Sequence, residues 1–129
     1  MTLTIKQTLW AAYTLLDELY KRIDILREDL NDEGLKKLLM DMDPFIFGDY
    51  TPADPALWED WKGLAEKKQC AGMLLEEDAF QVLCLFLNEN EDLYGYCADV
   101  ILQELQRSHS KALWKEFLIK ASEFTGENK

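Results

Sequence analysis

Three cysteines and a single histidine are the side chains of this 129-residue sequence with the widest chemistry. Cys70, Cys84, Cys97 and His109 offer the sulfur and nitrogen ligands that Zn²⁺ prefers. Structural zinc sites take their ligands in close pairs, whereas no two of these residues lie nearer than 12 positions. The spacing therefore disfavours zinc. We expect three free thiols, with Cys84 unreactive because it lies within an apolar run.

A second ion-binding pattern is Asn88-x-Asn90-x-Asp92, which has the ligand spacing of a calcium loop, with Asp99 at the twelfth position. The sixth position of such a loop needs glycine for a sharp turn, and this sequence has Leu93 there. The twelfth should be a bidentate glutamate. The pattern therefore disfavours calcium, and we expect no metal and no cofactor.

Catalytic motifs are equally sparse. His109 stands in a polar segment at an expected helix junction, without a local nucleophile or an orienting third group. Paired acids such as Glu76 with Glu77, or Asp41 with Asp43, become acid/base catalysts only in a pocket that shifts their pKa values. We therefore expect a non-catalytic protein, with an enzyme using carboxylate chemistry as one alternative.

Charge gives a more specific signal. The chain has 25 acidic and 14 basic residues, a net charge of -11, which excludes bare nucleic acid and anionic membrane as partners because both require clustered Lys and Arg. Fourteen of the acids fall in two windows without any base, residues 38–61 and 69–106. A surface of one sign is suited to steering a partner of the opposite sign, and the alternative is an acidic surface that only keeps the protein in solution.

The first of these windows also holds all three prolines and several aromatic residues. Phe45 and Phe47 are expected to pack beneath the loop, which leaves Tyr50 as its exposed aromatic residue. Tyr and Trp are enriched among interface hot spots, and carboxylates complement a basic partner. We predict a partner-binding face formed by six residues: Asp43, Asp49, Tyr50, Asp54, Glu59 and Asp60.

Helices must position these residues. Residues 5–30 carry a heptad seam, capped at Thr4 and ended by a break at residues 31–34. This seam predicts a core helix, with a coiled-coil homodimer as the alternative. A short helix from Leu35 must stop before Pro44. Asp54 and Pro55 then have the residue types of an N-cap and a first helical position.

The second half of the chain predicts three more helices. Residues 79–87 are apolar on nearly every side, so we expect them to form the central helix of the fold. A polar break at residues 88–92 precedes a helix with Tyr94, Cys97, Ile101 and Leu105 on one stripe. A last helix runs from about Ser110 to a stop at Gly126.

The fold predicted for residues 1–129 is thus one all-α domain, a compact bundle of five or six helices with a Pro- and aromatic-rich loop between the second and third. The longest apolar run, residues 82–87, is far below the roughly 20 residues that span a bilayer. With three unpaired cysteines this favours the cytoplasm. The expected core comprises Leu16, Leu19, Ile23, Leu83, Phe86, Ile101 and Phe117.

These expectations converge on a small acidic cytoplasmic protein that binds another protein without catalysis. An immunity or antitoxin-type inhibitor, which covers the basic site of its target, has this combination of size, charge and missing catalytic groups. The alternatives are the structural homodimer or oligomer assembled through the first helix and the enzyme with carboxylate chemistry.

Overall fold

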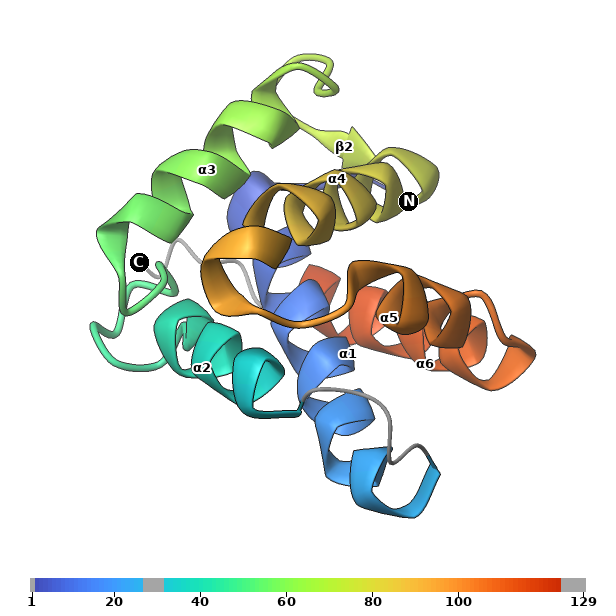
Figure 1. Ribbon diagram of the computed structural model, residues 1–129. Helices are drawn as coiled ribbons and strands as arrows, with labels where there is room; N and C mark the ends of the chain where they lie inside the picture. The colour runs from blue at the N-terminus through green and yellow to red at the C-terminus, as the bar shows by residue number, and fades with distance from the viewer. Residues whose placement is uncertain (1, 27–31, 124–129) are drawn as a thin grey trace.

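The computed structural model describes residues 2–26 and 32–123, and within them the chain forms six helices and one small sheet (Figure 1). The elements in order are β1 (Thr2–Leu3), α1 (Ile5–Leu26), α2 (Asp32–Met42), α3 (Pro55–Glu66), β2 (Leu74–Leu75), α4 (Glu76–Tyr94), α5 (Ala98–Leu105) and α6 (Ser108–Glu123). The predicted all-α bundle is confirmed, including the loop between α2 and α3.

Helix α1 begins at a reciprocal cap. The Gln7 amide N–H donates to Thr4 Oγ1 (3.2 Å), and the Thr4 amide N–H donates to Gln7 Oε1 (2.8 Å). The heptad seam then faces inward, with Leu9 and Leu16 fully buried. Helices α2, α3 and α6 pack around α1, which runs through the middle of the molecule (Figure 1). The predicted seam residues Ile23, Leu26 and Leu30 lie outside the described side chains.

The expected core is confirmed wherever it is described. Leu83, Phe86 and Ile101 are fully buried, and Trp61 packs edge to face on Phe86 with 5.2 Å between ring centroids. Leu16, Leu19 and Phe117 are buried as well.

Helix α4 departs from the sequence-based expectation in two ways. It is not surrounded on all sides, because Leu85 is exposed. Nor does it break at residues 88–92, since the helix continues to Tyr94. Asn90 is buried there and its amide donates to the Phe86 carbonyl oxygen (3.0 Å), so the polar residue is satisfied inside the helix. A left-handed Gly95 (φ 85°) ends α4 instead.

The expected break at residues 31–34 is also wrong for its described part, because α2 already begins at Asp32. Gly34 is buried against the end of α4. A Cβ atom at this position would lie 2.6 Å from the Tyr94 carbonyl oxygen and 2.8 Å from the Tyr96 amide nitrogen. The glycine therefore permits a close approach of two backbones and does not end a helix.

One element had no counterpart in the sequence pattern. Strands β1 and β2 pair antiparallel, with Thr2 opposite Leu75 and Leu3 opposite Leu74. Leu3 and Leu74 are both buried, so this short pairing fastens the start of the chain onto its middle.

The remaining boundaries depend on local caps. Asp54 caps α3 as predicted, its Oδ1 accepting from the Ala56 amide N–H (2.9 Å) with Pro55 in the first turn. The expected stripe that began with Tyr94 and Cys97 is corrected, because Tyr94 belongs to α4 and Cys97 precedes α5. Helix α6 begins at Ser108, and its predicted stop at Gly126 lies outside the described residues.

The three cysteines are free, as predicted. Cys70 is exposed, whereas Cys84 and Cys97 are half-buried. Cys84 is thus less enclosed than its apolar run indicated. Burial still raises the pKa of the Cys84 thiol, which lowers its thiolate fraction at neutral pH.

Candidate functional site

The α2–α3 loop, residues 43–54, exposes large apolar side chains on its outer surface. Phe45, Ile46 and Phe47 are 55%, 61% and 58% exposed. The expectation that Phe45 and Phe47 pack beneath the loop is therefore wrong. Pro44 and Pro52 are the buried residues of this loop and take the interior positions. Three consecutive apolar side chains are thus exposed at the molecular surface and are not part of the core.

Aspartate side chains hold the loop backbone in place. Asp43 Oδ1 accepts from the Phe45 amide N–H (2.9 Å). Asp49 Oδ1 accepts from both the amide N–H (3.0 Å) and the hydroxyl (2.6 Å) of Thr51. Asp54 makes the same two-residue contact at the cap of α3. Each aspartate thus satisfies the backbone two residues further on, the pattern of an Asx turn.

Aromatic rings connect the loop to the core helix. Phe45 packs edge to face on Tyr13 of α1, with centroids 6.1 Å apart, and on Tyr50, with centroids 6.4 Å apart. Tyr50 is half-buried, so it is not the exposed aromatic residue that the sequence indicated. Its φ of 65° lies in the left-handed region, which costs a non-glycine residue about 1–2 kcal/mol. The packing of the loop maintains this conformation.

The base of the loop is anchored through Asp41 at the end of α2. Its carbonyl oxygen accepts from the Asp54 amide N–H (2.9 Å), and its Oδ2 accepts from the Tyr94 hydroxyl (2.6 Å). Burial, and next this hydrogen bond, raise the pKa of Tyr94. The two contacts join both ends of the loop to each other and to α4, so residues 43–54 have fixed ends.

Electrostatics around the loop are negative. Hydrogen bonds from Thr51, first from its hydroxyl, lower the pKa of Asp49, and the nearby charge of Lys6 adds to the shift. Burial raises the pKa of Tyr13 to about 12, with further contributions from the charges of Asp43 and Asp17. At neutral pH the exposed apolar side chains are therefore bordered by carboxylates, and Lys6 is the base that acts on Asp49.

The six predicted partner-binding residues separate into two groups. Asp43, Asp49, Tyr50 and Asp54 all belong to the loop. Glu59 and Asp60 are exposed on α3, and Glu59 pairs with Lys62 (3.3 Å). Among the described residues no hydrogen bond, ion pair or ring contact joins Glu59 or Asp60 to the loop. Four of the six residues thus belong to one loop, and the other two belong to the helix that follows it.

Sequence analysis overlooked one residue of this surface. Ile46 lies between the two phenylalanines and is exposed like them. The available signal was the uninterrupted apolar run of residues 45–47 between Pro44 and Gly48.

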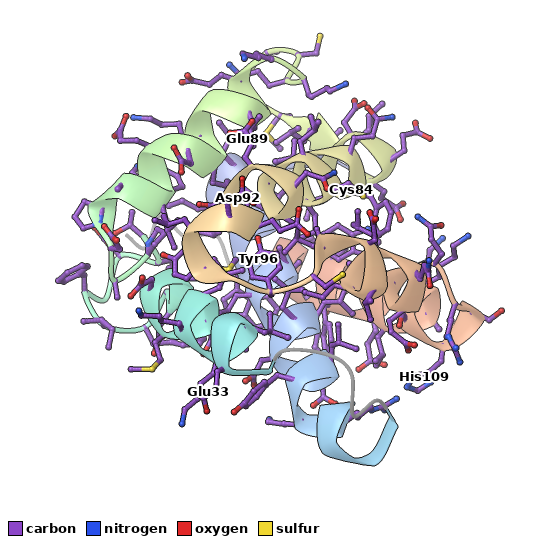
Figure 2. All side chains as sticks on the ribbon, viewed as in Figure 1. Glu33, Cys84, Glu89, Asp92, Tyr96 and His109 are labelled. Carbon is purple, nitrogen blue, oxygen red and sulfur yellow. The ribbon has the colours of Figure 1, made fainter. Side chains whose placement is uncertain are left out.

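A small cavity of about 190 Å³ lies between α1, α5 and α6, and its lining includes His109, Arg107 and Glu104. Glu104 is buried and pairs with Arg107 through its Nε (3.4 Å). Sequence analysis missed this buried acid. His109 is exposed in the first turn of α6, at the edge of the molecule (Figure 2). The ion pair joins the last turn of α5 to the residue that precedes α6.

No three His, Cys, Asp or Glu side chains in residues 2–26 and 32–123 are placed to hold a metal ion. The calcium-like segment around Asn90 is helical, with Glu89 and Asp92 on the outer side of α4 (Figure 2).

No helix of the described part of the chain has the length and apolarity needed to cross a membrane. Comparisons with protein-family models, curated proteins and solved structures found no match to this chain.

Proposed function

We propose that this protein binds a basic protein through the α2–α3 loop, as a non-catalytic inhibitor of the immunity or antitoxin type. The observation that carries the proposal is the exposed apolar run of residues 45–47, bordered by Asp43 and Asp49. A fitting partner offers an apolar pocket edged by Lys and Arg. Apolar anchors supply affinity in such an interface, and the surrounding charges supply steering and register.

Charge favours a different protein over a second copy of this chain. The protein carries a net charge of -11, and the same acidic border would face itself in a symmetric pair. Like charges placed opposite each other oppose association, whereas a basic surface gains attraction at long range. The apolar run alone would suit a second copy of this chain as well as another protein, so the acidic border is the feature that favours a basic protein.

Rigidity supports the same assignment. Two buried prolines, three Asx turns and the Asp41 anchor already order the backbone of the loop. Binding through an ordered loop loses less conformational entropy than binding through a floppy one. The exposed phenylalanines are thus presented by a backbone that needs little rearrangement.

The homodimer through α1 has less support. The described seam residues Leu9, Ala12, Leu16 and Leu19 are buried against the other helices of the same chain. A second copy could use this part of the seam only after α6 or α2 had moved away.

The test compares captured partners and binding kinetics. The immobilised protein is exposed to a lysate of its source cells, and the retained protein is identified and purified. We expect that protein to be basic, and we expect Ile46→Ser/Phe47→Ser to weaken its binding by about 30-fold or more, the effect of losing about 2 kcal/mol of hot-spot contact. Ile119→Ser on α6, a residue that is 44% exposed, is the matched control and should bind like the parent.

A charge variant tests the steering step separately. Asp43→Asn/Asp49→Asn/Asp54→Asn removes three charges but keeps the Oδ1 acceptors that hold the turns. This variant should associate more slowly, with a flatter dependence on salt and nearly unchanged dissociation. The proposal is overturned if the retained proteins are acidic, if the double serine variant binds within twofold of the parent, or if the purified chain is a dimer that this variant dissociates.

A further inference from the structure

A second surface feature lies away from the α2–α3 loop. A groove of about 600 Å³ runs between the start of α4 and one face of α6, and is called here the α4–α6 groove. Its apolar lining comes from Leu75, Phe80 and Trp114, and Lys111 and Lys115 border it on the α6 side. A volume of this size is within the range of small-molecule sites.

Trp114 gives this groove an unusual property. The residue is only 7% exposed, and its indole N–H is buried without a hydrogen-bond partner among the described residues. An unsatisfied buried donor costs about 1–3 kcal/mol. Trp61 shows the ordinary arrangement, because its indole N–H donates to Thr8 Oγ1 (3.2 Å). The Trp114 donor therefore lacks an acceptor in this part of the chain, and a ligand could supply one.

Positive charge also borders the groove. Lys111 and Lys115 are one helical turn apart, so their side chains share a face of α6. Both are exposed, and neither forms an ion pair with a described residue. Glu76 and Glu77 border the groove on the α4 side. These acids and the net negative charge of the whole protein repel anions, and the repulsion grows with the charge of the anion. A head group with a single negative charge is therefore favoured over a multiply charged one.

We propose that the α4–α6 groove binds a small apolar carboxylic acid in its ionised form. The hydrocarbon part lies over Leu75 and Phe80. The carboxylate accepts hydrogen bonds from the lysine ammonium groups and from the indole N–H of Trp114. This binding site is independent of the protein-binding function proposed for the α2–α3 loop.

Binding requires a small adjustment of the groove. The Trp114 indole nitrogen has no contact with solvent, and Phe80 packs edge to face on the indole, with centroids 5.9 Å apart. Phe80 is itself half-buried at the groove surface. The head group therefore reaches the indole N–H only when these two rings shift, and that shift is part of the proposal.

Nuclear magnetic resonance tests this proposal without any knowledge of the natural ligand. The chain has four tryptophans, so ¹⁵N labelling gives four indole N–H signals, and Trp114→Phe identifies the signal that belongs to Trp114. Sodium decanoate below its micellar concentration is the probe. We expect the Trp114 signal to shift saturably as it gains an acceptor, and the other three indole signals to move little.

Charge variants give the second arm of the test. Lys111→Gln/Lys115→Gln should weaken decanoate binding by at least about tenfold, the equivalent of about 1.4 kcal/mol. Lys36→Gln/Lys37→Gln on α2 removes the same charge elsewhere and should bind like the parent. Decyltrimethylammonium, with the same tail and the opposite charge, should leave the Trp114 signal in place.

Four outcomes overturn the proposal. Decanoate leaves the Trp114 signal unmoved, or it moves all four indole signals together as a denaturing detergent would. The two double variants bind decanoate equally, or decyltrimethylammonium shifts the Trp114 signal as decanoate does. Each outcome is measured on the folded parent or on surface lysine variants, and the Trp114→Phe protein serves only to assign the Trp114 signal.

Discussion

Two apolar runs of this chain have opposite fates. Residues 82–87 lie within α4 and bury Val82, Leu83, Phe86 and Leu87, while residues 45–47 lie in the α2–α3 loop and expose all three side chains. The difference comes from backbone geometry. A helix turns part of each run toward the core at regular intervals, whereas Pro44 and Pro52 occupy the inner side of the loop. Apolar composition alone therefore does not determine burial.

The largest expected effect tests this comparison through stability. Leu83→Ala should lower the free energy of unfolding by about 2–5 kcal/mol, because it removes buried methyl groups and leaves a cavity. Phe47→Ala should change it by no more than about 0.5 kcal/mol, as is usual for an exposed site. Urea denaturation of both variants measures the contrast. Equal losses would mean that Phe47 contributes to the core and that its exposure has been misjudged.

A medium effect is expected at the point where α2 meets the end of α4, which sets the base of the loop. Gly34→Ala places a Cβ atom 2.6 Å from the Tyr94 carbonyl oxygen, so one backbone must move, at a cost of about 1–3 kcal/mol. Gly63→Ala in α3 is the control, because apart from its chain neighbours and the nearby backbone of α3 no atom lies within 4 Å of its Cβ position. That variant should gain up to about 1 kcal/mol from helix propensity. A Gly34→Ala protein as stable as the parent would contradict the close approach of α2 and α4.

The smallest effect concerns the attachment of the loop through Tyr13, the ring on which Phe45 rests. Its folded-state pKa is raised from 10.0 to about 12. Below pH 10 the phenol is protonated in both the folded and the unfolded chain, so its contribution to stability is constant there. Between pH 10 and 12 the unfolded chain loses this proton first, and stability is lost as pH rises.

The measurement is urea denaturation of the parent and of Tyr13→Phe at several pH values between 9 and 12. The parent should lose more stability over this interval than the variant does, and the difference belongs to Tyr13 because burial raises the pKa of Tyr96 in both proteins. Parallel curves would show that Tyr13 is solvated, and that the loop does not cover it.

Features encoded by neighbouring residues could be predicted from sequence. The Asp54 cap with Pro55 was identified correctly because a cap involves only a few consecutive positions. The seam of α1 was identified because a helix repeats its buried face at a fixed spacing. The end of α2 before Pro44 follows from the steric effect of proline on the residue that precedes it.

Features that depend on distant residues could not be predicted. Strands of two residues carry no periodicity, so the pairing of Leu3 with Leu74 has no sequence signal. The polar segment around Asn90 remains helical because the Phe86 carbonyl oxygen accepts from its buried amide. The loop acids could be selected by charge, but the exposure of Phe45 depends on which other residues occupy the interior beneath it. The α4–α6 groove is formed by two helices that are not neighbours in the sequence, so no local pattern indicates it.

The central position of α1 has a consequence for synthesis of the chain. α1 packs most extensively with α6, which is the last of the described helices to leave the ribosome. At a translation rate of about 5–20 residues per second, roughly 4 to 16 s separate the end of α1 from the start of α6. During that interval the apolar seam of the nascent helix lacks its principal cover. A chain that stops before Ser108 therefore presents an uncovered seam to the cell instead of a shorter folded domain.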